Sequence, residues 1–314
     1  AWGHTVNQPD LVDVFKLELN PSNPNQYKVD GEWLDLERSL APLEIRLWGN
    51  FRWTVNREVL YSIYGPSMRV DDQVFAIRYA GIGEFRQIEQ WYPMGRAHNL
   101  DEFKDAMRIH ALAMFNTGYG DRNGNIFYVY NALLPERADG HDWSGTVPGN
   151  TRDTLWKEYR PFDELPTVEN PKSGFIQNCN SDPFQTTTGE DNPDETAFSE
   201  NYGIEKWMTN RARRAVELYG GDDSINHDEF FRYKYDKTYS EKSELRMQVV
   251  NFIDAQPESN GLKKELELLR QWNGEMAKNN RSAALVLLTF RPRSNSSKRK
   301  TEHERTLDQL EKAS

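Results

Sequence analysis

Arg211 occupies a position where a charged side chain could take part in chemistry. It opens the segment 211–218, in which Ala215 and Leu218 follow it at spacings of four and seven residues. Those spacings put the three side chains on one face of a predicted helix, and we expect that face to pack inward. An inward-facing guanidinium needs an anionic or carbonyl partner. Such a partner belongs either to a catalytic site or to a buried structural ion pair.

The other residue types that commonly react or bind metals do not form a site by their spacing. The single cysteine, Cys179, has no histidine nearby in the sequence, which favours a small buried apolar side chain over a nucleophile. The six histidines show no metal-ligand spacing. Residues 121–125 (DRNGN) match half of an EF-hand calcium loop, but the twelfth position is Ala132, which cannot ligate calcium. The Asn123-Gly124 pair instead predicts a hairpin turn.

The composition is that of a globular protein and argues against two classes of partner. Of the 314 residues, 37% are hydrophobic and 12% are aromatic, and the net charge is −10. Basic residues cluster only at 298–300, so no nucleic acid is expected as a partner, because phosphate binding needs clustered Lys and Arg. The best apolar run, 283–290, is far shorter than the ~20 residues of a membrane span. The single cysteine excludes a disulfide within this chain and leaves the compartment open.

Alternating apolar and polar residues predict an antiparallel sheet in the region 11–80. The period of two is clear in 43–48, 58–64 and 73–79, and Gly, Pro, Asn and Asp residues separate these stretches as turns. A further hairpin is predicted over 115–130, around the Asn-Gly turn.

Helical patterns dominate the rest of the sequence. Asn99 followed by Glu102 is typical of a helix N-terminus. The helix that contains Arg211 should end at Gly220-Gly221. Two apolar stripes after residue 205 predict further helices, and they consist of Leu245, Val249 and Phe252 and of Leu262, Leu266, Leu269 and Met276.

Three other features complete this outline. Residues 135–200 are rich in loops, which in a compact protein are usually functional or mobile. Arg213 and Glu217 should form an ordinary surface pair on their helix. A polar break at 294–300 should precede a last amphipathic helix at 301–313.

Short blocks spread along nearly the whole sequence resemble the penicillin acylase family of N-terminal-nucleophile hydrolases. They are residues 1–7 (AWGHTVN), 10–15 (DLVDVF), 64–66 (YGP), 96–103 (RAHNLDEF), 121–128 (DRNGNIFY), 161–166 (PFDELP), 170–175 (NPKSGF), 177–180 (QNCN), 271–274 (QWNG) and 282–284 (SAA). The blocks follow the family's order, although Tyr64 replaces a family histidine. The run from His4 to Asn7 resembles the branch of acyl-homoserine-lactone and aculeacin acylases more than the penicillin G branch.

The resemblance implies an α+β fold, the αββα sandwich of the N-terminal-nucleophile hydrolase class, with a mostly helical C-terminal portion. Residues 1–204 would be part of the catalytic core with hairpin and loop insertions, and 205–314 the helical region of the same chain. Family precursors cleave themselves, and the new N-terminal Ser is nucleophile and, through its α-amine, general base. That Ser is expected several dozen residues before Ala1. This sequence would then be an internal piece of the catalytic β chain, inactive by itself.

The same resemblance implies partners and a compartment. We expect an α chain from the same precursor, a small-molecule N-acyl substrate such as an acyl-homoserine lactone or a β-lactam side chain, and no cofactor for catalysis. A periplasmic or secreted location follows from the family. Trp2, Phe15, Phe175 and Phe184 could line an acyl pocket, although aromatic side chains at such positions are more often core residues.

By this resemblance, three residues would carry the chemistry. The backbone N–H of Val6 and the side-chain amide of Asn180 would stabilise the oxyanion of the tetrahedral intermediate, each by ~3 kcal/mol. Arg211 would lie near the amine of the nucleophile, where its charge would keep that amine neutral. The alternative is that Val6 is a core residue, Asn180 caps a loop and Arg211 forms a structural ion pair.

Asp10, Val12 and Asp13 match a calcium site found in some family members, with two carboxylates and a carbonyl as hard oxygen ligands. A further acid would come from Asp191 or Asp194. The alternative is a pair of solvated aspartates at the start of a strand. Calcium also enters the competing interpretation of the chain, a non-catalytic secreted module that binds calcium or a ligand such as a polymer. A Ser behind a cleavable junction upstream would favour the enzyme.

Overall fold

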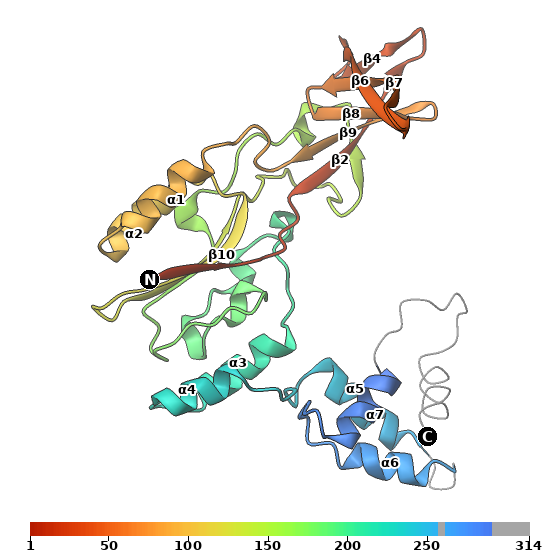
Figure 1. Cartoon of the computed structure of the whole chain (residues 1–314). Coiled ribbons are helices and arrows are strands. Elements are labelled where there is room, and N and C mark those ends of the chain that lie inside the picture. Colours follow the sequence, from red (N-terminus) through yellow and green to blue (C-terminus); the bar gives the residue numbers. More distant parts are fainter. Residues whose placement is uncertain (257–260, 291–314) are drawn as a thin grey trace. The chain divides into compact units, whose positions relative to one another are not determined.

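The structure, a computed structural model, describes residues 1–256 and 261–290 (Figure 1). The chain divides into two compact units. Unit 1 comprises Ala1–Thr167 and Pro193–Glu205, and unit 2 comprises Val168–Asn192 and the chain from Lys206 onward. Residues 168–192, which the sequence analysis placed with the first 204 residues, therefore cluster with the helical part of the chain.

A four-stranded sheet contains the first residues of the chain. Its order is β1-β10-β11-β13, and the strands are β1 (Trp2–Thr5), β10 (Met114–Gly120), β11 (Ile126–Ala132) and β13 (Thr167–Glu169). β1 runs antiparallel to β10, with Thr5 opposite Asn116. β10 and β11 form the predicted hairpin, and the Asp121 carboxylate closes its turn by accepting the backbone N–H groups of Asn123 and Asn125.

Two helices pack on this sheet, α1 (Gln87–Arg96) and α2 (Leu100–Met107). Phe103 of α2 is fully buried against Trp2 of β1 and Tyr119 of β10, with ring centroids 6.2 and 4.7 Å away. Asn99 caps α2 as predicted, since its side chain accepts the N–H of Glu102. The first strand is thus held between a neighbouring strand and a helix.

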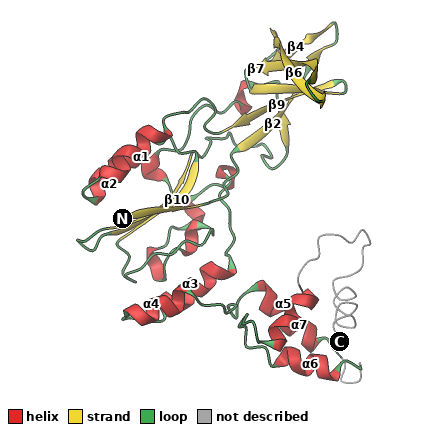
Figure 2. Cartoon of the chain, viewed as in Figure 1, coloured by secondary structure: helices red, strands yellow, loops and turns green. Residues whose placement is uncertain are grey.

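The second sheet of unit 1 has six strands and accounts for most of the predicted antiparallel region (Figure 2). Its order is β12-β2-β9-β8-β7-β6, with β2 (Val12–Leu17), β6 (Glu37–Trp48), β7 (Phe51–Ser62), β8 (Gly65–Val70), β9 (Gln73–Tyr79) and β12 (Thr146–Pro148). A separate three-stranded sheet consists of β3 (Leu19–Asn20), β4 (Asn23–Val29) and β5 (Glu32–Asp35). Phe15 of β2 stacks on Tyr64, which lies between β7 and β8, with ring centroids 4.7 Å apart, and both are fully buried.

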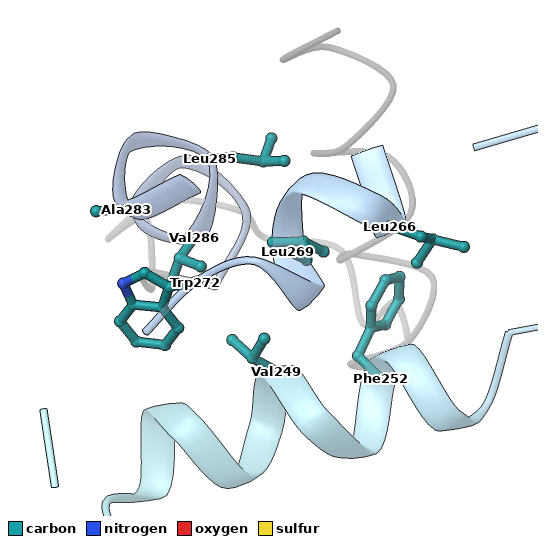
Figure 3. Packing of buried hydrophobic residues seen from close by; sticks show 8 residues of the cluster. All are labelled: Val249, Phe252, Leu266, Leu269, Trp272, Ala283, Leu285 and Val286. Atoms are coloured by element: carbon teal, nitrogen blue, oxygen red, sulfur yellow. The ribbon is translucent and has the colours of Figure 1, made fainter. Parts of the chain in front are cut away.

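The other α-helices of residues 1–256 and 261–290 belong to unit 2. They are α3 (Asn210–Gly220), α4 (His227–Lys234), α5 (Glu244–Asp254), α6 (Lys263–Arg270) and α7 (Arg281–Phe290). The predicted stripes of α5 and α6 meet α7 in one apolar cluster, in which Val249 and Phe252 point from α5 towards Leu269 and Leu266 (Figure 3). Trp272 completes the cluster beside α7.

Six short 3-10 helices occur in the loop-rich stretch between residues 152 and 202. They are η1 (Arg152–Thr154), η2 (Phe162–Glu164), η3 (Pro183–Gln185), η4 (Gly189–Asp191), η5 (Glu195–Ala197) and η6 (Glu200–Tyr202). Several begin at an Asp, Ser or Thr side chain that accepts a backbone N–H two residues later.

The predicted α+β class is confirmed, with two differences in detail. Arg214, not Arg213, pairs with Glu217, at 2.8 Å, because a spacing of three residues also shares a helix face and Asp236 draws Arg214 to the same place. Met276 packs on the apolar cluster but lies beyond the end of α6. The helix expected at 301–313 lies outside the described residues.

None of the helices within 1–256 and 261–290 is long and apolar enough to cross a membrane.

Candidate active site

Val6 lies directly after the last residue of β1, and its side chain is 46% exposed. The alternative in which Val6 is a core residue is therefore wrong. The next residue, Asn7, is the buried one at 1% exposure, and its Nδ2 donates to the backbone oxygen of Asn131 at 3.0 Å. The strand before Val6 and the buried amide after it fix the path of the backbone through this position.

Asn180 lies in a loop of unit 2 and adopts a left-handed backbone conformation, with φ of 59°. Asparagine tolerates this region better than most residues, because its short polar side chain can bond locally. The N–H of Asn180 donates to Oδ1 of Asn178 at 3.0 Å. The preceding carbonyl, that of Cys179, accepts the hydroxyl of Thr209 at 3.0 Å.

Arg211 is the residue that orients the side chain of Asn180. Its Nη2 donates to Oδ1 of Asn180 at 2.7 Å and to the carbonyl oxygen of Cys179 at 3.1 Å. Because the side-chain oxygen of Asn180 faces the guanidinium, the side-chain nitrogen is turned the other way and is the hydrogen-bond donor of this amide. The positive charge also polarises the amide C=O bond, which makes the N–H groups stronger donors. The arrangement suits a side chain that must donate a hydrogen bond to a developing anion.

The structure thus brings together two of the three residues predicted to carry chemistry, Asn180 and Arg211, while Val6 belongs to unit 1. The predicted inward face of Arg211 is wrong. Its side chain is exposed, and Ala212 is the buried residue of α3, because Thr209 starts the helix so that Arg211 lies in its first turn. The carbonyl partner expected for Arg211 is nevertheless present.

Cys179 lies beside Asn180 without the features of a nucleophile. Its thiol is partly buried, and burial raises the pKa of that thiol, which keeps it protonated and weakly reactive. Its role in the described contacts is to offer its backbone carbonyl to Thr209 and Arg211.

The predicted calcium ligands lie where the chain enters β2. Asp13 is 1% exposed, and its Oδ2 accepts from Nε of Arg137 at 2.9 Å and from the indole N–H of Trp156 at 2.6 Å. Its Oδ1 is buried without a hydrogen-bond partner among the described residues. The carboxylate of Asp10 lies 3.6 Å from the same guanidinium, and its carbonyl accepts from it at 2.9 Å.

These contacts test whether the residues suit a calcium ion. Asp13 has one buried oxygen for a cation, but Arg137 already supplies positive charge to both aspartates. Asp194 is committed to its own loop, where it accepts from Thr196, and Asp191, in unit 2, accepts the N–H of Lys172 at 2.7 Å. No group of three or more His, Cys, Asp or Glu residues that could hold a metal occurs in 1–256 or 261–290. The calcium site stays a prediction, with Asp13 as its best-supported ligand.

Sequence reasoning missed three residues near these positions: Arg137, Trp156 and Glu205. Arg137 joins Asp13 across more than a hundred residues, and Glu205 accepts the N–H of Gln8 at 2.9 Å across 197 residues. A charged residue in a loop carries no signal of burial in the sequence. Of the four aromatic residues considered for an acyl pocket, Phe15 belongs to the core, at 0% exposure.

Comparison with known proteins agrees with this architecture. The sequence profile of the family described as Penicillin amidase matches residues 1–310. Penicillin G acylase of Escherichia coli is 31% identical over 183 residues, which cover 58% of this chain and 21% of that protein. The acyl-homoserine lactone acylase PvdQ of Pseudomonas fluorescens (strain Pf0-1) is 27% identical over 143 residues, covering 43% of this chain and 18% of that protein.

A solved structure of a thermostable penicillin G acylase from Alcaligenes faecalis has the same fold, with a TM-score of 0.72 at 23% identity. The similarity covers 92% of this chain and 51% of that chain. The chain thus spans about half the length of this solved relative and about a fifth of each curated one. The predicted fold of the N-terminal-nucleophile hydrolases is confirmed. With a profile match over nearly all of its residues, the chain belongs to the penicillin amidase family.

Proposed function

We propose that this chain is part of an amidohydrolase that cleaves a linear amide into a carboxylic acid and an amine. The observation that carries the proposal is the contact between Arg211 and Asn180, which turns the amide nitrogen of Asn180 into an oriented donor. Membership of a family whose named relatives are acylases supports the same reaction.

The proposed mechanism begins with a Ser at the N-terminus of the mature catalytic chain, upstream of Ala1, as the family resemblance implies. Its hydroxyl attacks the amide carbon, and its α-amine takes the proton and passes it to the leaving amine. The carbonyl oxygen becomes an anion, for which the N–H of Val6 and the amide of Asn180 each supply one donor. Each donor lowers the barrier by ~3 kcal/mol. The intermediate collapses as the C–N bond breaks and the protonated amine leaves, so the acyl group remains on the Ser as an ester. Water, deprotonated by the same α-amine, then attacks this ester and releases the acid while the Ser regains its proton.

The positive charge of Arg211 acts through Asn180 in this proposal. It withdraws electron density from the amide oxygen at 2.7 Å and so strengthens the N–H donors on the other side of the amide. We further propose that a guanidinium near the α-amine of the nucleophile keeps that amine unprotonated at neutral pH.

The substrate we propose is a small N-acyl compound, such as an acyl-homoserine lactone or the acylated side chain of a β-lactam. The named acylases of E. coli and Pseudomonas fluorescens support this class. We also propose an α chain cut from the same precursor as partner, and a periplasmic or secreted location.

A structural calcium ion is part of the proposal, with the carboxylates of Asp10 and Asp13 and the carbonyl of Val12 as ligands and with no role in the chemical step. The buried, unpartnered Oδ1 of Asp13 supports it. Thermal unfolding of the full-length protein with 1 mM calcium and with excess chelator tests this part. A higher melting temperature with calcium supports the ion, and identical curves contradict it.

The proposal as a whole is tested on the full-length gene product. N-terminal sequencing and intact-mass measurement should find a mature chain that begins with Ser upstream of Ala1. Release of acid and amine should be measured against N-acyl substrates with aliphatic and aromatic acyl groups. Turnover of at least one amide is expected. An uncleaved chain without turnover on any of them would overturn the function.

A further inference from the structure

Asn7 and Gln8, which follow Val6 after β1, are tied to β11 by buried polar side chains. Asn7 makes the first tie, with its Nδ2 bonded to the carbonyl of Asn131 at 3.0 Å. Asn131 in turn donates from its own Nδ2 to the carbonyl of Leu112 at 3.0 Å. Both asparagines are at least 99% buried, so this chain of amides lies in the core of unit 1.

Glu205 makes the second tie, through both of its carboxylate oxygens. Oε1 accepts the backbone N–H of Gln8 at 2.9 Å, and Oε2 accepts the hydroxyl of Tyr130, a short contact. Glu205 is 9% exposed, and Tyr130 is fully buried on β11 beside Asn131. One carboxylate therefore links the backbone after Asn7 to the same strand that anchors the Asn7 side chain.

The phenol hydroxyl of Tyr130 is the donor in its hydrogen bond with Glu205. Burial, followed by the negative charge of Glu205, raises the pKa of its phenol, so the hydroxyl keeps its proton at neutral pH.

Burying the polar groups of these two ties costs folding free energy, which a connection between two strands does not require. A buried carboxylate loses its hydration, and here its named partners are a backbone N–H and a phenol rather than a cation. The Oδ1 atoms of Asn7 and Asn131 are buried without a hydrogen-bond partner among the described residues. A surface loop that only had to connect β1 to β2 would end its hydrogen bonding in water at lower cost.

We infer that Asn7, Tyr130 and Glu205 are positioning residues that set the direction of the Val6 N–H. The register of β1 fixes the backbone up to Thr5, and the two ties fix it from Asn7 onward, so the peptide at Val6 is held from both sides. The inference rests on the proposed function, in which that N–H is one of the two oxyanion donors. A misplaced Val6 N–H would reduce the stabilisation of the transition state and leave the affinity for the substrate unchanged.

The test uses the processed full-length enzyme and a substrate that the wild type hydrolyses. Tyr130→Phe and Glu205→Ala should each lower kcat roughly 10- to 100-fold, with KM changed less than about 2-fold. Glu205→Gln should restore most of the rate, because its amide oxygen can accept from Gln8 and its nitrogen can bond to Tyr130.

Tyr64→Phe is the matched control. Tyr64 is equally buried, and its hydroxyl donates to the carbonyl of Thr151 at 2.7 Å, but it has no described contact with residues 6–8. It should lose a similar amount of stability and keep its kcat. If Tyr130→Phe and Glu205→Ala match Tyr64→Phe in both properties, the positioning role is wrong.

A second measurement separates this inference from the proposed function. Hydrogen exchange at the Gln8 N–H should quicken roughly 10-fold or more in Glu205→Ala and stay slow in Tyr64→Phe. Quickened exchange without a fall in kcat, in an enzyme that Asn180→Ala does impair, overturns the positioning role alone. A wild type that hydrolyses no amide overturns the proposed function and this inference with it.

Discussion

The two segments that would hold the oxyanion are built in opposite ways. Val6 follows a paired strand, and buried groups fix the backbone after it. A few residues further along the same segment, Asp13 pairs with Arg137, and both side chains are 1% exposed. Asn180 stands in a loop and owes its orientation to an exposed arginine, Arg211. The difference follows from the donor: a backbone N–H can be aimed only by fixing the main chain, whereas a side-chain amide needs one partner that fixes its rotation.

The first way to test this comparison is to remove the buried arginine. Arg137→Ala leaves the Asp13 carboxylate buried with Trp156 as its remaining named donor, which should cost about 3–5 kcal/mol of unfolding free energy. Arg152→Ala is the control, because Arg152 pairs with Asp30 at the surface, where about 0–1 kcal/mol is expected. Denaturant titration measures both. Equal losses would show that the first segment does not depend on buried charge.

The second way is to remove the backbone donor itself. Val6→Pro has no N–H, and kcat should fall by about 10²- to 10³-fold, whereas Val6→Ala keeps the donor and should keep nearly all of the rate. The exposed Val6 side chain makes the alanine variant a fair control. Steady-state kinetics on the full-length enzyme compare the two. A large loss in Val6→Ala would mean that the side chain, not the N–H, is what matters.

The third way addresses the exposed arginine. Arg211→Ala should leave the unfolding free energy nearly unchanged but lower kcat roughly 10-fold, because the Asn180 amide loses the partner that orients it. Arg211→Lys should recover part of the rate, since a lysine supplies the charge without the planar fork of donors. A loss of stability as large as that of Arg137→Ala would contradict the contrast between the two arginines.

The smallest effect is expected from pH, and it concerns the first segment. Burial lowers the pKa of His4, whose Nε2 accepts the indole N–H of Trp91 at 3.0 Å. If His4 were protonated, its Nε2–H and the indole N–H of Trp91 would both be donors and their hydrogen bond would be lost. Since the unfolded chain then binds the proton more readily, unfolding free energy should fall as the pH drops below the ordinary value of 6.5 and level off below the folded pKa. His4→Gln should flatten that fall between pH 7.5 and 5, and an unchanged slope would contradict the assignment.

Much of the fold could be predicted because its signals are local. The hairpin over 115–130 rests on the Asn123-Gly124 turn, and the cap of α2 rests on Asn99 and Glu102, three residues apart. The pairing of β12 with β2 could not be predicted. It is parallel, and its partners Val14 and Thr146 are separated by most of unit 1, so no turn signal connects them.

The candidate site divides in the same manner. Asn180 and Val6 could be named because short blocks around them resemble a family. For Arg211, the sequence predicted an anionic or carbonyl partner but not which residue supplies it. The burial of Glu205 and Arg137 could not be foreseen, since each is a charged residue in a loop whose partner is far away in the sequence. Only the folded chain shows that Glu205 bonds to the backbone of Gln8 and that Arg137 pairs with Asp13.

The most direct test of the central claim compares two asparagines in the full-length enzyme. Asn180 and Asn170 both have positive φ, 59° and 45°, so alanine at either position carries a similar backbone strain. Asn180→Ala should lower kcat by about 10²- to 10³-fold with little change in KM, while Asn170→Ala should stay within about 2-fold of the wild type. Equal rates for the two variants would contradict the assignment of Asn180 as an oxyanion donor.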